Sequence, residues 1–201
     1  MKFIYIPLAL LLFLTLLLSS FELTLYLFHS PFNSIIIEPQ AHTTTWTYLL
    51  KQKYITLINV DIFTINEKRH LLDVKRLLDK LYNLWSALSV LSFFSIIFLY
   101  VKAKESIALI FKYNFIIGLI VIALSIFLAF DFLDSFKTFH QLVFPMGSWI
   151  FPDNSILIKW FPLEYFQDFL AVVVLIFSIG ISVHASLFPN LLTTKSPLLK
   201  R

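Results

Sequence analysis

Four long apolar runs constrain the fold of this 201-residue chain more than any other feature. They lie at about residues 3–20, 83–101, 113–130 and 168–188. A helix needs roughly 20 mainly apolar residues to cross the hydrocarbon core of a bilayer, which is about 30 Å thick. Hydrophobic residues make up 59% of the chain and charged residues 14%, against roughly 45–50% and about 25% in soluble domains. We therefore predict an α-helical integral membrane protein, a single membrane domain with about four transmembrane helices.

The segments between these runs, about residues 21–82 and 131–167, are expected to form a small extracytoplasmic lobe. In the first segment, Phe21–Phe28 and Lys53–Phe63 are rich in β-branched and aromatic residues with imperfect alternation, a pattern typical of short strands. The second segment is rich in phenylalanine and tryptophan, which favours a place at the membrane interface. The lobe is therefore predicted to contain strands.

The most highly charged stretch, Asn66–Lys80, leads directly into the second apolar run and carries eight charged residues. Just before it, Thr64 and Glu67 have the spacing of a capping box, which predicts the start of a helix. A straight helix over residues 65–101 would be roughly 55 Å long, whereas the bilayer core is about 30 Å thick. We therefore expect the charged, amphipathic half to lie along the membrane surface and the span to begin near residue 83.

The distribution of basic residues predicts the orientation. Residues 102–112 and the C-terminal tail hold three lysines or arginines each, whereas the whole segment 131–167 holds two. Short basic segments near span ends favour the cytoplasm, although the basic cluster before the second run favours the opposite arrangement. The first run resembles a signal peptide, but no A-x-A-like cleavage site follows it, and we expect an uncleaved span. Both termini are predicted to be cytoplasmic and the lobe external.

The chain lacks the residues that several classes of function require. The chain has no cysteine, which excludes disulfides, thiol nucleophiles and cysteine metal sites. It contains no G-x-S-x-G, P-loop or G-x-G-x-x-G motif. Its pI is about 9.2, but the basic residues lie near predicted span ends, where lipid headgroups attract them. We therefore expect membrane lipids as partners and no nucleic acid.

Two histidines are the strongest candidates for chemistry. His70 and Asp73 are three residues apart, so on a helix they share a face and the carboxylate can orient or charge the imidazole. His140 lies among aromatic residues just beyond the third run. Both are predicted on the same side of the membrane, each beside a span end, which allows them to meet. The alternatives remain a solvated surface histidine at His70, a hydrogen-bonded interfacial histidine at His140, or a metal site formed by both.

The other ionisable candidates are weaker. His29 and His42 fall in the strand-like region, where we expect surface residues. His184, near the end of the fourth run, is expected to pack between helices or to reach headgroups. No second ligand stands at the close spacing of a zinc motif, so no metal site is predicted.

Two stretches carry a resemblance to a known family. The first is ExxHLxDVK, which begins at Glu67, and the second is FHQLVF with WIF and FPLEYF, within Phe139–Phe166. Both resemble the lipoprotein intramolecular transacylases, a family of bacterial four-span membrane enzymes. The resemblance extends to the four-span layout, although its specific part is about a fifth of the chain. His70 and His140 occupy the positions of the essential histidine pair of the family. Val143 departs from the doubled phenylalanine of the family's pattern, so we expect the pocket near His140 to be reshaped.

The resemblance implies an acyltransferase of the bacterial cytoplasmic membrane with its active site on the extracytoplasmic side. Its substrates would be diacylglyceryl lipoproteins, and the sn-2 acyl chain would move to the α-amine of the N-terminal cysteine, giving the lyso-form. His70, oriented by Asp73, is expected to be the general base, and His140 the general acid or carbonyl-polarising group, although the roles are exchangeable. Trp149 and Glu164 are the candidate substrate-binding residues, with Trp149 shaping the acyl groove.

Acid–base catalysis of this kind needs no metal or other cofactor, because an imidazole near its ordinary pKa both accepts and donates protons. The sequence leaves two alternatives to a transacylase open. One is a non-catalytic membrane protein whose lobe binds a partner or lipid, and the other is a lipid hydrolase that uses the same histidines.

Overall fold

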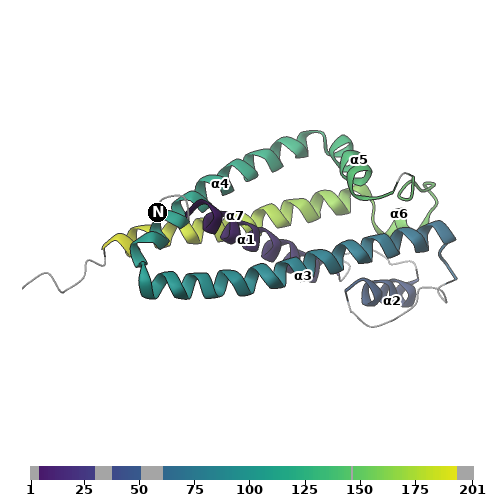
Figure 1. Ribbon diagram of the computed structural model, residues 1–201. Coiled ribbons are helices and arrows are strands. Elements are labelled where there is room, and N and C mark those ends of the chain that lie inside the picture. The colour runs from purple at the N-terminus through teal and green to yellow at the C-terminus, as the bar shows by residue number, and fades with distance from the viewer. Residues whose placement is uncertain (1–4, 30–37, 51–60, 146, 194–201) are drawn as a thin grey trace, which may run out of the picture. The chain divides into compact units, whose positions relative to one another are not determined.

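The computed structural model describes residues 5–29, 38–50, 61–145 and 147–193, and every regular element in these ranges is a helix. In chain order they are α1 (Tyr5–Phe28), α2 (Pro39–Leu50), α3 (Ile65–Lys102), α4 (Lys104–Phe130), α5 (Phe132–Val143), α6 (Ile156–Trp160) and α7 (Leu163–Thr193) (Figure 1). By length and composition, α1, α3, α4 and α7 each contain a segment able to cross a membrane. The predicted α-helical membrane class is confirmed, whereas the exact limits of each span stay a prediction.

The strands predicted for the lobe are wrong where the structure describes the chain. Residues 21–28 form the last turns of α1, because no glycine or proline interrupts the helix after Pro7. Residues 39–50 form α2, in which the hydroxyls of Thr43, Thr44 and Thr45 each donate to the carbonyl four residues earlier, at 2.8–3.0 Å. Of the second expected strand, Lys53–Phe63, residues 53–60 lie outside the described residues.

The capping box at the start of α3 is confirmed. The backbone N–H of Thr64 donates to Oε2 of Glu67 at 2.7 Å, and the backbone N–H of Glu67 donates to Oγ1 of Thr64 at 3.3 Å. From there α3 continues over 38 residues, a length of roughly 57 Å. No break separates its charged half from its apolar half, because residues 65–102 contain neither glycine nor proline.

The chain divides into two compact units. Unit 1 comprises residues 1–23, 84–127 and 172–201, and unit 2 comprises residues 24–83 and 128–171. Within the described residues, unit 1 therefore contains most of α1, the apolar half of α3, most of α4 and most of α7. Unit 2 contains the end of α1, α2, the charged half of α3, α5, α6 and the first turns of α7.

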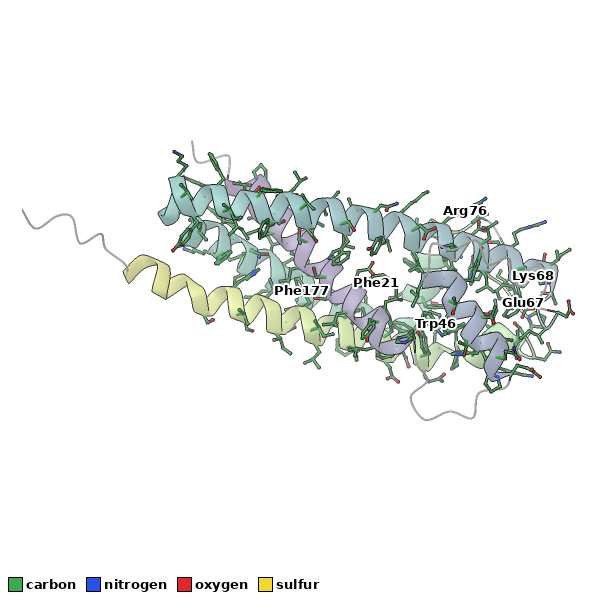
Figure 2. All side chains as sticks on the ribbon, turned by 90° about the horizontal axis from the view of Figure 1, so that it is seen from below. Phe21, Trp46, Glu67, Lys68, Arg76 and Phe177 are labelled. Atoms are coloured by element: carbon green, nitrogen blue, oxygen red, sulfur yellow. The ribbon has the colours of Figure 1, made fainter. Side chains whose placement is uncertain are left out.

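Unit 1 is held together by apolar packing and by hydrogen bonds between its helices. Thr15 of α1 shares a hydrogen bond with Ser92 of α3, at 2.7 Å between the hydroxyl oxygens. The indole N–H of Trp85 donates to the Ser19 hydroxyl at 2.9 Å. Phe13 meets the ring of Phe177, which is labelled in Figure 2, edge to face at 5.7 Å. Such contacts suit helices in lipid, where packing and hydrogen bonds replace the hydrophobic effect between helices.

A polar pair inside unit 1 accounts for His184. Its Nδ1 lies 2.7 Å from Nδ2 of Asn114, a residue with no exposed surface. The imidazole also stacks on Phe111, with 4.8 Å between ring centroids. The sequence left two expectations for His184, and the structure confirms the first: His184 of α7 packs against α4.

Unit 2 is held together by aromatic contacts from α2, α3 and the segment around α6. The Lys75 ammonium of α3 lies 5.6 Å from the ring centroid of Tyr48 in α2. Trp46 of α2 meets Phe161 at 5.7 Å, and Trp160 meets Phe63 at 5.5 Å, both edge to face. These contacts fix α2 and α6 beside the first turns of α3.

Gly180 offers a test of the close packing in unit 1. A Cβ atom at this position would lie 2.6 Å from Cδ1 of Leu16 in α1, so Gly180→Leu forces the two helices apart. Overpacking of this kind typically costs about 1–3 kcal/mol. Thermal unfolding in detergent should show a lower midpoint for Gly180→Leu, whereas Val183→Leu, at a half-exposed position of the same helix, should leave it unchanged. Equal midpoints for the two variants would contradict the packing.

Candidate active site

The structure brings His70 and His140 together within unit 2. His70 lies two turns into α3, and His140 lies in the last turn of α5. Their ring centroids are 6.2 Å apart, and the ring planes differ by 30°. The start of α5 is fixed by Asp131, whose carboxylate accepts a hydrogen bond from the backbone N–H of Asp134. Two residues separated by 70 positions in the sequence thus form one pair of imidazoles, as the sequence predicts.

The hydrogen bond of His140 defines which of its nitrogens carries a proton. Nδ1 lies 2.9 Å from the carbonyl oxygen of Phe136, and a carbonyl oxygen only accepts hydrogen bonds. Nδ1 therefore carries hydrogen, and in the neutral ring Nε2 keeps its lone pair. Burial lowers the pKa of His140, and the bond to Phe136 partly opposes that shift. His140, only 7% exposed, is consequently a neutral imidazole with Nε2 ready to accept a proton.

His70 is also uncharged at neutral pH. It belongs to the charged half of α3, which is too polar for the hydrocarbon core. Burial and, to a smaller extent, the neighbouring His140 lower the pKa of His70 to about 4, while the charge of Asp73 acts in the opposite direction. Its Nδ1 is buried and has no hydrogen-bond partner among the described residues. Such an unpaired atom leaves a hydrogen-bonding position open for a substrate group.

Asp73 does not make the hydrogen bond to His70 that the sequence suggests. Its Oδ1 lies 3.5 Å from Nη1 of Arg76, in an ion pair along the same helix. Asp73 therefore influences His70 through its charge, and the aromatic residues around His70 orient its ring instead.

Aromatic rings enclose the pair from three elements. Phe144, at the end of α5, contacts both imidazoles, with centroids 4.9 Å from His70 and 5.3 Å from His140. Phe151 lies 5.4 Å from His70, and Trp149 lies 5.1 Å from His140. Three further rings contact His140, namely Phe136 at 4.0 Å, Phe139 at 5.5 Å and Phe166 at 6.5 Å. This lining covers most of both rings, His140 more completely than the partly exposed His70, and explains why the pKa of each imidazole is lowered.

The two predicted substrate-binding residues differ in position. Trp149 contacts His140, as described above. Glu164 is exposed in the first turn of α7, where its charge suits a helix N-terminus, and in the described part of the chain no ring contact or hydrogen bond joins it to either histidine. Val143 is 38% exposed, whereas the buried Phe144 makes the contacts with the pair, so the departure at Val143 leaves the pair's aromatic cover in place.

His42 is not the surface residue that the sequence predicts. It is 8% exposed, and its Nε2 accepts a hydrogen bond from Nε1 of Trp46 at 3.2 Å. Trp160 and Phe161 contact its ring at 5.0 and 6.3 Å, and burial lowers its pKa. The prediction failed because α2 is a helix, which turns His42 toward its own Trp46 and the residues of α6. His29, by contrast, is exposed.

The sequence gives no sign of the other members of the site. Phe136, Phe144 and Phe151 are three of 23 phenylalanines, and only the fold distinguishes them from those that face lipid. Ser155 donates a hydrogen bond to Glu67 across 88 positions, a contact that no local spacing encodes. Among the described residues, no group of three or more histidine, aspartate or glutamate side chains is placed to hold a metal ion.

Comparisons with known proteins agree on one family. The family model of the lipoprotein intramolecular transacylase Lit matches residues 39–166. A solved structure of the integral membrane lipoprotein intramolecular transacylase Lit from Bacillus cereus superposes with a TM-score of 0.74 at 19% identity, covering 96% of this chain and 97% of that one. A histidine-to-arginine variant of the same protein gives a TM-score of 0.68 at 19% identity, with 95% and 93% covered. No curated protein sequence matches the chain.

The buried imidazoles predict a loss of stability in acid. Because the pKa of His70 lies near 4 in the folded protein and near 6.5 in the unfolded chain, the unfolded state binds more protons between these values. Stability should therefore fall as the pH drops from about 6.5 toward about 4. Thermal unfolding in detergent at several pH values should show a smaller fall for His70→Asn than for the wild type. The control His29→Asn, at an exposed histidine, should keep the full dependence. An unchanged fall in His70→Asn would refute the buried, neutral state of His70.

Proposed function

Because the chain belongs to the lipoprotein intramolecular transacylase family, we propose that it moves the sn-2 acyl chain of a diacylglyceryl lipoprotein to the α-amine of the lipoprotein's own N-terminal cysteine. The family is one of acyltransferases, and the four apolar helices make this member a multi-pass membrane protein. The product of the proposed reaction is a lyso-form lipoprotein. The observation that carries the proposal is the pair of neutral imidazoles, 6.2 Å apart, inside an aromatic lining.

His140 is the general base in this proposal. The attacking α-amine has an ordinary pKa of about 7.7–8.0, so it must lose protons before and during its attack on the ester carbonyl. Nε2 of His140 is the available acceptor, because Nδ1 is held by the Phe136 carbonyl. This assignment exchanges the roles expected from the sequence, where Asp73 favoured His70 as the base.

His70 is the hydrogen-bond donor to the reacting ester. A neutral imidazole carries one N–H, and His70 has the open position at its unpaired Nδ1. Through its N–H it polarises the carbonyl oxygen or protonates the departing glycerol oxygen. The reaction forms one C–N bond and breaks one C–O bond, and the proton that leaves the amine replaces the acyl group on the glycerol oxygen. Acid–base help of this kind typically contributes about 10²–10⁴-fold.

The aromatic lining favours transfer over hydrolysis. Phe144, Phe151 and Trp149 cover the imidazoles, and a site that excludes water protects the ester from attack by water. Amine and ester belong to one substrate molecule, so their effective concentration is high once the headgroup is held. This combination supports a transacylase over the lipid hydrolase that the sequence leaves open.

The bacterial cytoplasmic membrane is the proposed location, with unit 2 and its histidines on the extracytoplasmic side. The short basic segments at residues 102–112 and at the C-terminus support this orientation. The lipoprotein substrate, anchored by its acyl chains, would then meet the pair at the outer leaflet.

Replacing either histidine should nearly abolish the lyso-form product. Mass spectrometry of the N-terminal peptide of a host lipoprotein should detect the lyso-form with the wild-type chain and a reduction of about 10²-fold or more with His70→Ala or His140→Ala. Asp73→Asn should keep a partial rate, because its carboxylate acts only through charge. Protein levels must be equal, and His29→Ala serves as the control at an exposed position. Normal product from both well-expressed alanine variants would refute the site.

The orientation has its own test, which the absence of natural cysteines makes simple. Asn154 and Lys102 are exposed positions, the first in unit 2 and the second at the end of α3. In intact cells, an impermeant thiol reagent should label Asn154→Cys and should not label Lys102→Cys until the membrane is opened. Labelling of Lys102→Cys alone would invert the proposed topology.

A further inference from the structure

A buried carboxylate that the proposed chemistry does not use lies one turn before His70. Glu67 is only 3% exposed. Its Oε2 accepts hydrogen bonds from the backbone N–H and the hydroxyl of Thr64, at 2.7 and 2.8 Å, and its Oε1 accepts one from the Ser155 hydroxyl at 2.5 Å. Figure 2 shows Glu67 near the start of α3. A capping box requires only the contacts with Thr64, so the bond to Ser155 needs a separate explanation.

Ser155 connects Glu67 to the loop that covers the histidines. Its hydroxyl oxygen caps α6 by accepting from the backbone N–H of Leu157 at 3.2 Å, and this N–H also interacts with Glu67. Ser155 is the last residue of the segment between α5 and α6, of which the structure describes residues 144–145 and 147–155 and which we call the cover loop. The cover loop supplies Phe144, Phe151 and Trp149, the three rings described above. Glu67 thus fastens one end of the cover loop, while α5 holds the other.

Glu67 and His70 lie on the same face of α3. Residues three apart on an α-helix are neighbours on its surface, so Glu67 fixes the cover loop to the same face that presents His70. Without the bond between Glu67 and Ser155, the part of the loop near Phe151 is held only through its continuation into α6 and its own ring contact with His70, so it can shift away from His70.

We propose that Glu67 is a positioning residue of the active site, whose buried carboxylate holds the cover loop against α3 and keeps Phe144 and Phe151 over His70. The inference rests on the proposed function for its meaning in catalysis, although the anchoring itself is a property of the folded chain.

A carboxylate suits this position better than any neutral side chain. Every partner of Glu67 in this network is a donor, and the Thr64 N–H cannot act as an acceptor. Burial raises the pKa of Glu67, but the hydrogen bonds from Ser155, Thr64 and the Leu157 N–H outweigh it, so the pKa lies below its usual range. Glu67 is therefore ionised at neutral pH. Because donors occupy both of its oxygens, it does not serve as the proton acceptor of the reaction.

Three variants and a control test the proposal. Ser155→Ala removes the donor from the loop, Glu67→Gln presents an amide N–H to a site of donors, and Ser155→Thr retains the hydroxyl. Asp153→Asn, at an exposed position of the same loop, is the matched control. The transfer rate should fall about 10- to 100-fold, mainly in kcat, for Ser155→Ala and Glu67→Gln, since a displacement of about 1 Å can cost 10²-fold. Ser155→Thr and Asp153→Asn should retain the wild-type rate.

The decisive readout is the titration of His70, followed by NMR of histidine-labelled protein in detergent without substrate. The groups whose charge acts on His70, Asp73 on its own helix and His140 on α5, are unchanged in these variants. Glu67→Gln also removes a negative charge one turn from His70, which by itself would lower the pKa of His70, so a raised pKa in this variant does not come from the lost charge. Ser155→Ala and Glu67→Gln should raise the pKa of His70 from about 4 toward 6.5, because water enters as the cover loop moves, and should shift the acid limb of the pH–rate profile in the same direction.

Wild-type titration of His70 in both variants would overturn the proposal, whatever happens to the rate. If Glu67→Gln fails to fold, Ser155→Ala alone decides, because it removes the bond to Glu67 and the cap on the Leu157 N–H but leaves the capping box of α3 intact. The titration uses no substrate, so it tests the anchoring separately from acyl transfer. If the pKa of His70 shifts in the variants but the wild-type protein transfers no acyl chain, the proposed function is refuted and the anchoring role of Glu67 is retained.

Discussion

The burial of two imidazole rings among aromatic side chains is the constraint on which the site depends. Burial disfavours the charged form of histidine, and two imidazoles 6.2 Å apart disfavour double protonation further. The pair is therefore neutral, which gives each ring one donor and one acceptor. That state suits a transfer in which one group loses a proton and another gains it. The Phe136 carbonyl then distinguishes the two rings, because it leaves only Nε2 of His140 as the acceptor on that ring.

Among the described residues, Glu67 and His70 differ in how their buried polar atoms are hydrogen-bonded. Glu67 uses its carboxylate to satisfy donors from Thr64, one turn before it, and from the distant Ser155, and this stabilises the arrangement around His70. His70 itself keeps an unpaired Nδ1, an arrangement that costs stability in an apolar setting. The unpaired Nδ1 of His70 next to the fully hydrogen-bonded Glu67 is consistent with a substrate-binding position at His70. Contacts such as those of Glu67 offset the stability lost at His70.

The sequence predicts the membrane class, the capping box at Thr64 and the meeting of His70 with His140, since these depend on run length, local spacing and topology. It mispredicts residues 21–28 and the environment of His42. β-branched and aromatic residues are typical of strands in soluble proteins, but they also occur in helices that are surrounded by lipid or by packed aromatic rings. The interaction of Ser155 with Glu67 and the choice of Phe144 and Phe151 as lining depend on contacts between distant segments, which periodicity does not encode.

A crossover experiment with purified protein tests the central claim most directly. Two diacylglyceryl lipopeptides of different peptide sequence, one with an isotopically labelled sn-2 acyl chain, are mixed with the protein in detergent, and the products are analysed by mass spectrometry. If the histidine pair directs an intramolecular transfer, each peptide retains its own acyl chain, now on the α-amine, and no free fatty acid accumulates. Label on the amine of the other peptide, or release of labelled fatty acid, would contradict the account.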